Sequence, residues 1–349
     1  MKKAALVVGA RPQFIKTAPL ILELGRFFKM VLIHTGQHYD FMMSENFFDE
    51  LAIPDPDYHL EASGKTPGKQ LGRMIQGLEA AFATEKPDLA IVVGDTNSTL
   101  AGAITAVKFG LPLAHVEAGV RSKSKTLPEQ INRLVTDSIT DYFLSPTPLS
   151  VENLKREGKT EHLYDTGDVI YDCLRLSENR IPKMPESLRS LPARFILATI
   201  HRAEAVDNVE NLTNILHSFG TASTPVILPV HPRTMKMLKT FDLVGTLPGN
   251  LILIDPLGYL DILSLVRRSY LVVTDSGGVQ REAIYLGKPV IVARPETEWV
   301  EFEHLGWLKV AGYRFDLTEK FETPGFKSAE LMHLLRPAAA GMAEILRNL

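Results

Sequence analysis

The sequence lacks several features that mark whole classes of protein. One cysteine, Cys173, occurs among 349 residues, which excludes an internal disulfide framework and a cysteine-rich metal site. No apolar run reaches the roughly 18 residues of a membrane span. The stretch 1–10 is too short and too strand-like for a signal peptide. We therefore expect a cytoplasmic protein with no membrane partner, since a single cysteine fits a reducing compartment.

The chain also lacks an excess of charge of either sign. It carries 38 Lys and Arg against 41 Asp and Glu, for a formal net charge of -3. A dedicated nucleic-acid binder is usually basic overall or in a block, so we expect no nucleic-acid partner. An anionic ligand must then be held by local groups. Hydrophobic residues make up 45%, enough for full cores, and the length leaves room for two domains at roughly 100–200 residues each.

A short apolar run, a turn and a longer amphipathic stretch recur along the first half of the chain. Such strand–helix alternation predicts a parallel, doubly wound sheet. The expected strands are 4–8, 30–34, 89–93, 112–116 and 142–144, and the expected helices are 11–24, 66–84, 96–109, 129–140 and 148–157.

The same pattern restarts after a proline-rich interruption at 179–193. The expected strands are 195–199, 226–230, 251–254, 271–274 and 289–292, and the expected helices are 208–220, 259–267 and 279–285. We place the crossover near 167–172. This predicts an N-terminal Rossmann-like domain over 1–168, with a C-terminal helix 330–349 packing back on it, and a C-terminal Rossmann-like domain over 169–329. Their strand ends are expected to line a central cleft.

The first polar cluster follows the first strand. Gly9 allows a tight turn there, and Arg11 and Lys16 are expected near the N-terminus of the next helix, where the helix dipole favours an anion. A plain strand–helix turn with solvated cations is the alternative. The three-glycine dinucleotide fingerprint is missing, so a nicotinamide cofactor is not expected.

Three carboxylates follow strands or open a helix in the first half. Asp95 follows the strand 89–93, Glu117 ends the next strand, and Glu129 opens a helix. Each has a structural alternative: Asp95 as a helix cap, Glu117 as a partner of Arg121, and Glu129 as ordinary helix-dipole chemistry. Together they predict a cleft able to supply an acid and a base.

Two histidines follow adjacent strands in the second half. His201, followed by Arg202, and His231 stand where they would bind a diphosphate. A satisfied surface histidine is the alternative reading of His201.

The segment 274–282 carries the strongest local signal. A strand runs into Ser276, Gly277 and Gly278 and then into a helix, which leaves backbone N–H groups accessible to phosphate oxygens. Glu282 on that helix is expected to accept the hydroxyls of a ribose; a bare glycine turn is the alternative. No metal site is expected, because His34 and His38 lack a completing carboxylate pattern. No Gly-x-Ser-x-Gly motif indicates a serine nucleophile.

The chain resembles the non-hydrolysing UDP-N-acetylglucosamine 2-epimerase family. Eight segments carry the resemblance in family order: GARPQFIK, HTGQHYD, GDTNSTLAGA, HVEAG, PEQINR, HRAE, HPRT and TDSGGVQREA. The resemblance implies two Rossmann-like domains of the kind shared with one large class of glycosyltransferases. It also implies a UDP-sugar substrate, a homodimer, and a role in supplying N-acetylmannosamine for surface polysaccharides.

Carried over by motif, the resemblance assigns two sets of residues. It implies catalytic roles for Asp95, Glu117, Glu129 and His201. It implies nucleotide contacts for Arg11, Lys16, His231, Ser276, Gly277, Gly278 and Glu282, with Arg202 alongside them.

The sequence departs from the family at Trp299, where many members carry an arginine. The form Thr297-Glu298-Trp299-Val300-Glu301 resembles a branch that acts on UDP-2,3-diacetamido-2,3-dideoxyglucuronate, so this substrate is an alternative to UDP-N-acetylglucosamine. A glycosyltransferase with the same UDP-binding groups is the alternative from another class. It would need an acceptor groove, and the first domain shows no basic, apolar patch for one.

Inversion at C2 must break a C–H bond that no carbonyl acidifies. We therefore expect UDP to leave first, or nearly first, to give a 2-acetamidoglycal, followed by reprotonation on the other face and re-addition of UDP. This route needs no redox cofactor. It needs stabilisation of departing UDP and groups that transfer protons at C2.

Overall fold

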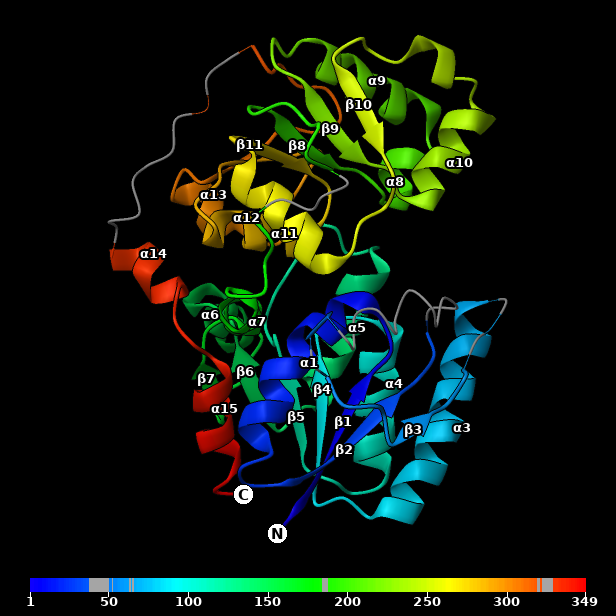
Figure 1. The fold of residues 1–349 in the computed structure, drawn as a ribbon. Coiled ribbons are helices and arrows are strands. Elements are labelled where there is room, and N and C mark those ends of the chain that lie inside the picture. Colours follow the sequence, from blue (N-terminus) through cyan, green and yellow to red (C-terminus); the bar gives the residue numbers. More distant parts are fainter. Residues whose placement is uncertain are drawn as a thin grey trace. The chain divides into compact units, whose positions relative to one another are not determined.

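The computed structural model describes residues 1–37, 50–51, 53–62, 64, 66–183, 188–318, 321 and 329–349. They form two compact units: 1–176 together with 332–349, and 177–331. Each unit is built on one fully parallel sheet with helices on its faces (Figure 1). The expected fold class, two Rossmann-like parallel-sheet domains, is confirmed.

The first unit has a sheet in the order β3-β2-β1-β4-β5-β6-β7. Its strands are β1 Lys3–Val8, β2 Lys29–His34, β3 Tyr58–His59, β4 Leu89–Val93, β5 Leu113–Val116, β6 Tyr142–Ser145 and β7 Leu163–Asp165. Its helices are α1 Arg11–Leu24, α3 Pro67–Glu85, α4 Asn97–Lys108, α5 Pro128–Ile139, α6 Pro148–Arg156, α7 Val169–Ser177 and α15 Ala339–Leu346, with α14 Ala329–Leu334 leading into it.

The second unit has a sheet in the order β10-β9-β8-β11-β12-β13. Its strands are β8 Ile196–Thr199, β9 Val226–Pro229, β10 Leu251–Ile254, β11 Leu271–Thr274, β12 Val290–Val292 and β13 Leu308–Val310. Its helices are α8 Ala203–Val206, α9 Val209–Gly220, α10 Pro232–Thr240, α11 Tyr259–Arg268, α12 Gly277–Tyr285 and α13 Val300–His304, with the short 3-10 helix η2 Val244–Thr246 before β10.

Strand composition and helix caps explain these elements. β4 is buried along its whole length, as expected of a parallel strand covered on both faces. Thr96 and Thr147 accept the N–H groups of the residues three positions on, in the first turns of α4 and α6, and such caps satisfy donors that a helix start leaves open. A proline in the first turn opens α1, α3, α5, α6 and α10, where its missing N–H costs nothing.

The order of the strands locates the polar edge of each sheet. In the first unit the order reverses between β1 and β4, and in the second between β8 and β11. Ligands of doubly wound sheets bind at such reversals, beyond the carboxyl ends of the strands. The turns after these four strands contain Gly9, Asp95, His201 and Asp275.

Residues 332–349 belong to the first unit and contain the end of α14 and the whole of α15, so the single helix expected over 330–349 is wrong. Pro337 lies between α14 and α15, and a proline disfavours continuation of the helix before it. α15 packs on α1 (Figure 1). Asp172 of α7 accepts the backbone N–H of Ala338 at 2.8 Å and that of Ala339 at 3.4 Å, which caps the start of α15.

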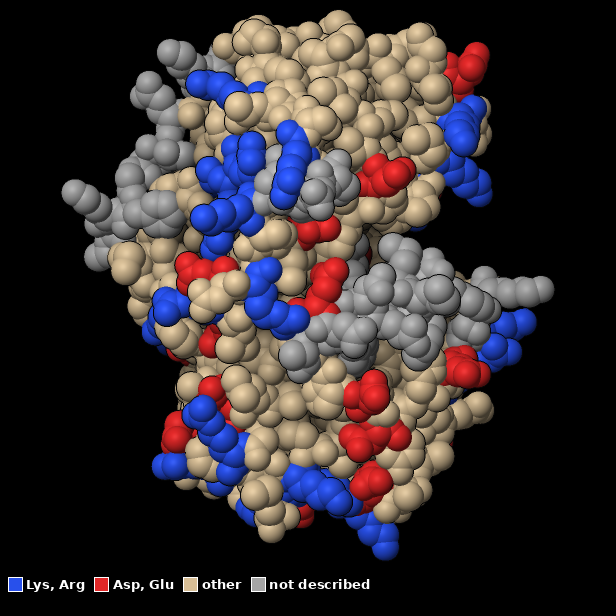
Figure 2. Space-filling view, in the orientation of Figure 1, with Lys and Arg blue, Asp and Glu red and all other residues tan. Residues whose placement is uncertain are grey.

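Side chains of both charge signs are mixed over the face shown in Figure 2, in keeping with the net charge of -3. Among the helices of the described ranges, none combines the length and the apolarity needed to cross a membrane.

The Asp172 cap predicts a pH-dependent stability. Burial raises the pKa of Asp172 to about 6, although the hydrogen bonds from the backbone N–H groups of Ala338 and Ala339 act in the opposite direction. A raised folded-state pKa stabilises the fold at low pH, and this contribution is lost as the pH rises through about 6. Asp172→Asn should therefore gain about 1–3 kcal/mol relative to the wild type between pH 4 and pH 7. Urea unfolding across this range measures the difference.

Asp55→Asn is the matched control, because Asp55 is an exposed carboxylate of the same unit. Its difference from the wild type should stay flat with pH. A flat difference for Asp172→Asn as well would contradict the assigned cause.

Candidate functional site

The carboxyl edge of the first unit is built on a buried ion pair. Lys16 of α1 and Glu117, which follows β5, lie 2.5 Å apart, with side chains 5% and 8% exposed. The sequence had suggested Arg121 as the partner of Glu117, and that is wrong: Arg121 binds Asp137 and Glu157 instead. Lys16 Nζ also lies against Gly94, so one ammonium group bridges the turns after β4 and β5.

Glu117 occupies a strained backbone conformation, with φ of +75°. A side chain in this region costs roughly 1–3 kcal/mol and persists where the surroundings enforce it. Two residues on, Gly119 has φ of +80°, and a Cβ there would meet the carbonyl oxygen of Ser150 at 2.2 Å. The turn that carries Glu117 is therefore held in one shape.

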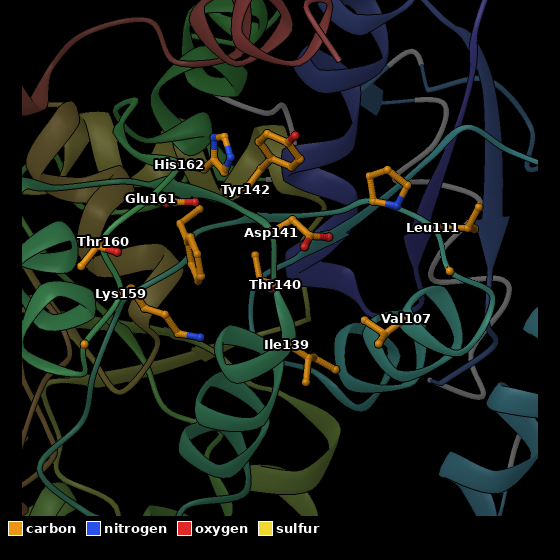
Figure 3. Close-up of a pocket in the computed structure, with 14 residues that line it drawn as sticks. Val107, Leu111, Ile139, Thr140, Asp141, Tyr142, Lys159, Thr160, Glu161 and His162 are labelled. Carbon is orange, nitrogen blue, oxygen red and sulfur yellow. The ribbon is translucent and has the colours of Figure 1, made fainter.

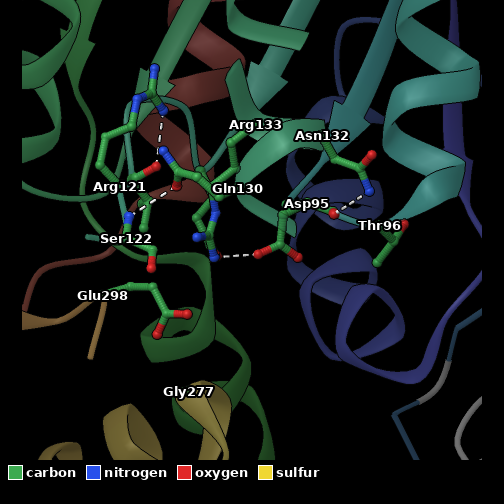
Figure 4. A network of polar contacts seen from close by, with 12 residues as sticks. Asp95, Thr96, Arg121, Ser122, Gln130, Asn132, Arg133, Gly277 and Glu298 are labelled. Carbon is green, nitrogen blue, oxygen red and sulfur yellow. Dashed lines mark hydrogen bonds and ion pairs between the residues drawn. The ribbon is translucent and has the colours of Figure 1, made fainter. Parts of the chain in front are cut away.

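Asp95 is held from α5 on two sides. Arg133 forms an ion pair with its carboxylate, and Asn132 donates to its backbone oxygen at 2.9 Å (Figure 4). The structural alternative for Asp95 is wrong, because Thr96 caps α4. Neither Asn132 nor Arg133 was assigned a role from sequence, although both lie in the PEQINR segment.

Glu129 lies in the first turn of α5, one turn before Arg133. Its carboxylate forms no hydrogen bond or ion pair with any residue in the described parts of the chain. α5 thus brings Glu129 to the same edge as Asp95, with one carboxylate paired and the other open.

The turn after β1 is closed by a residue that sequence reasoning missed. The side-chain oxygen of Gln13 accepts the N–H groups of Gly9 and Ala10 at 2.8 and 3.1 Å. Its amide nitrogen donates to Val93, which ties this turn to β4. Arg11 is the first residue of α1, and its side chain lies outside the described part of the structure.

Asp275 organises the carboxyl edge of the second unit. Its carboxylate is fully buried and accepts the backbone N–H groups of His201 and Arg202, both at 2.7 Å. Asp275 also lies 3.5 Å from the His201 ring. Asp275 lies in the motif at 274–282, but no role was predicted for it from the sequence.

The two predicted histidines come together at this edge. The rings of His201 and His231 have centroids 5.4 Å apart, and His231 caps α10 by accepting the N–H of Arg233 at 3.1 Å. Because that N–H points at Nδ1, Nε2 of His231 is its N–H donor. The guanidinium of Arg202 lies 3.7 Å from Glu204.

The start of α12 offers unused donors. The backbone N–H of Ser276 donates to the hydroxyl oxygen of Thr274 at 3.0 Å. The prediction that this N–H is accessible to a phosphate oxygen is therefore wrong. The N–H groups of Gly277 and Gly278 meet no acceptor among the residues that the structure describes. Trp299 packs against Gly277: a Cβ there would come within 3.2 Å of the indole nitrogen. Glu282 is buried on α12, 2% exposed.

No group of three His, Cys, Asp or Glu suited to a metal occurs within the described ranges. His38, which was considered with His34 as a metal ligand, lies outside the described ranges, as does the end of the HTGQHYD segment. A cavity of about 750 Å³ lies at the amino ends of β5 and β6, lined by residues such as Leu111, Asp141 and Tyr142 (Figure 3). None of the predicted site residues lines it, and parallel sheets bind ligands at the other edge.

The fold is of the α/β class, with a polar carboxyl edge on each of its two parallel sheets, and proteins of this class bind ligands at such edges. Residues 22–317 match the model of the UDP-N-acetylglucosamine 2-epimerase family. The chain belongs to this family, which confirms the resemblance, and it is therefore an isomerase.

Relatives from two kinds of organism share most of the chain. A Methanococcus maripaludis protein named UDP-N-acetylglucosamine 2-epimerase homolog is 45% identical over 89% of this chain and 88% of its own. The Pseudomonas aeruginosa UDP-2,3-diacetamido-2,3-dideoxy-D-glucuronate 2-epimerase is 43% identical over 90% of each. The crystal structure of the Methanocaldococcus jannaschii UDP-GlcNAc 2-epimerase with UDP-GlcNAc and UDP superposes with a TM-score of 0.88 at 35% identity, covering 100% of both chains.

The buried Lys16–Glu117 pair predicts a large loss of stability when its cation is removed. Lys16→Met should cost about 3–5 kcal/mol, because Glu117 stays buried without that cation. Arg156→Met, which breaks an exposed pair with Glu152, should cost about 0–1 kcal/mol. Chemical denaturation measures both.

The double variant Lys16→Met/Glu117→Gln should recover part of the loss, since it also removes the buried carboxylate charge. Equal losses in Lys16→Met and Arg156→Met would contradict the burial of this pair.

Proposed function

We propose that this chain inverts C2 of UDP-N-acetylglucosamine to give UDP-N-acetylmannosamine. The observation that carries the proposal is the division of chemistry between two edges. The first unit presents Asp95, Glu117 and Glu129, which are groups for proton transfer. The second presents two histidines and an uncapped helix start, which are groups for a diphosphate.

UDP departs through the second-unit groups in this proposal. The C1–O bond breaks, and its electron pair leaves with the diphosphate. Hydrogen bonds from His201, His231 and the N–H groups of Gly277 and Gly278 stabilise the charge that develops on UDP. Arg11, Arg202 and Ser276 are proposed as further UDP contacts, and Glu282 as the acceptor of ribose hydroxyls.

Proton transfer at C2 belongs to the first unit. A carboxylate takes the C2 proton as UDP leaves, which forms the C1=C2 bond of a 2-acetamidoglycal. A second group returns a proton to the opposite face, and UDP adds back at C1. Glu129 is open and Asp95 is held by Arg133, so the two differ in environment, which favours different roles in an acid–base pair.

A second substrate is favoured by a specific observation. The Pseudomonas aeruginosa relative is nearly as similar to this chain as the archaeal one, and Thr297–Glu301 has the form that resembles its branch. The guanidinium of Arg281 lies 3.8 Å from the centroid of the Trp299 ring, and the indole lies beside Gly277. UDP-2,3-diacetamido-2,3-dideoxyglucuronate is therefore the alternative substrate of the same C2 inversion.

The test of the reaction is incubation with each UDP-sugar alone in deuterated water. NMR should find the C2 epimer with deuterium at C2, because enzyme groups remove and return that proton. Glu129→Gln should lower the rate about 10²–10⁴-fold while UDP still binds in calorimetry. It breaks no ion pair of the described structure, so the loss reports chemistry rather than folding.

Glu79→Gln, the same change at an exposed position of α3, is the matched control and should keep the wild-type rate. No epimer from either sugar would overturn the proposal and favour a glycosyltransferase, which needs an acceptor. A preference above tenfold for the uronate, about 1.4 kcal/mol in the transition state, would reassign the substrate.

We propose further that two copies of the chain associate through α5. Several polar residues of this helix, among them Asn132, Arg133 and Asp137, are buried. Its outward face carries Ile131, Leu134 and Val135, all 38–47% exposed. Neighbouring α4 adds the exposed Val107 and Phe109. An apolar patch of this kind marks a protein interface, and a second copy can cover it by two-fold symmetry.

Sedimentation velocity tests the dimer. The wild type should sediment as a dimer at micromolar concentration, and Ile131→Glu/Val135→Glu as a folded monomer by circular dichroism. Val209→Glu, an isolated exposed apolar position on α9, should leave the dimer intact. A monomeric wild type would refute the proposal.

The role in polysaccharide supply and the cytoplasmic location stay predictions.

A further inference from the structure

His115 is fully buried on β5 between two oxygen atoms. Its Nδ1 lies 2.6 Å from Oδ1 of Asp137, and its Nε2 lies 2.7 Å from the carbonyl oxygen of Gly94. A carbonyl oxygen and a carboxylate only accept hydrogen bonds, whereas a neutral imidazole has one donor and one acceptor nitrogen. A neutral ring would point a lone pair at one of these oxygens. Both contacts are satisfied when both ring nitrogens carry protons.

Asp137 is arranged to remain the anion of this pair. Its Oδ2 accepts the backbone N–H of Gly119 at 3.0 Å and lies 2.8 Å from the guanidinium of Arg121. Burial raises its pKa, but His115 and Arg121 outweigh burial and hold it below the ordinary value. The proton between the two side chains therefore belongs to the imidazole, and a buried imidazolium–carboxylate pair results.

The pair holds both sides of the turn that carries Glu117. His115 is two residues before Glu117 and Gly119 is two residues after it, and Asp137 binds one with each carboxylate oxygen. Glu117 itself sits at φ of +75°, a conformation that needs outside support. The other side of the His115 ring binds Gly94, which has φ of +67° and directly precedes Asp95.

We infer that His115 and Asp137 are positioning residues, an imidazolium–carboxylate pair that holds the turns of Asp95 and Glu117 in register at the carboxyl edge of the first unit. The inference rests on the proposed function for what those two carboxylates do. It assigns neither His115 nor Asp137 a contact with substrate. Because misplacement by about 1 Å costs roughly 10²-fold in rate, loosening this pair slows the reaction without removing a reacting group.

Asp137→Asn tests the inference with little change of shape. An amide cannot accept on both sides, so either His115 or Gly119 faces an N–H donor. At saturating UDP-N-acetylglucosamine, kcat should fall about 10–100-fold. UDP affinity and KM should change less than about threefold, because binding groups are untouched.

Glu85→Gln is the matched control. Glu85 is also a carboxylate shared by two partners, Lys3 and Tyr58, but it lies at the amino edge of the same sheet. It should lower the melting temperature and leave kcat unchanged. An equal fall of kcat in both variants would show that Asp137 acts only through stability, and would overturn the positioning role.

A spectroscopic readout is independent of activity. With ¹⁵N-labelled histidine, His115 should show two ring N–H signals at neutral pH, identified by their loss in His115→Gln. Asp137→Asn should show only one. A single ring N–H for His115 in the wild type would overturn the inference whatever the kinetics show. If the wild type makes no C2 epimer, the proposed function fails, and this measurement still decides the state of the pair.

Discussion

Parallel strands that are buried on both faces leave one place for charged side chains, the turns at their shared ends. After the first residue of each strand, β1, β4 and β5 are apolar except for the buried His115. Asp95 and Glu117 follow within two residues of the ends of β4 and β5. Charges gathered there are partly withdrawn from water, so each needs a partner. Three ion pairs supply these partners: Lys16 with Glu117, Arg133 with Asp95, and Arg121 with Asp137. The edge is therefore a network in which position and charge are set together.

Local pattern was enough to find most strands of both sheets. All ten expected strands are present to within one residue, and the expected helix 11–24 coincides with α1. The strands that were missed, β3, β7 and β13, have two or three residues each, too few for a run or an alternation to show. β3, β7 and β13 lie at the outer edges of the sheets, each paired with the strand before it in the chain, so pairing in the folded sheet rather than local pattern defines them.

The site divides in the same way. Motif and strand position led to the candidate turns, because most of the candidate residues stand at a carboxyl strand end or in the first turn of a helix. Which side chain pairs with which did not follow. Arg121 was the nearest cation to Glu117 in sequence, but Lys16 reaches it across about 100 positions of chain because β1 and β5 flank β4 in the sheet. Gln13 and Asp275 were overlooked for a related reason: their work is to satisfy backbone N–H groups, which no residue pattern reveals.

α5 shows how one helix can serve the site and still leave its outer face apolar. A helix on a sheet normally buries its apolar stripe, yet α5 turns Gln130, Arg133 and Asp137 inward. These residues reach the Ser122 backbone, Asp95 and His115 respectively, so most of the inward face of α5 makes polar contacts. Of the four large apolar residues of α5, Ile139 packs against the core of the first unit, whereas Ile131, Leu134 and Val135 are exposed. The polar contacts on the inner side of α5 thus account for its exposed apolar face. In the proposed dimer, a second copy of the chain would cover that face by apolar contact.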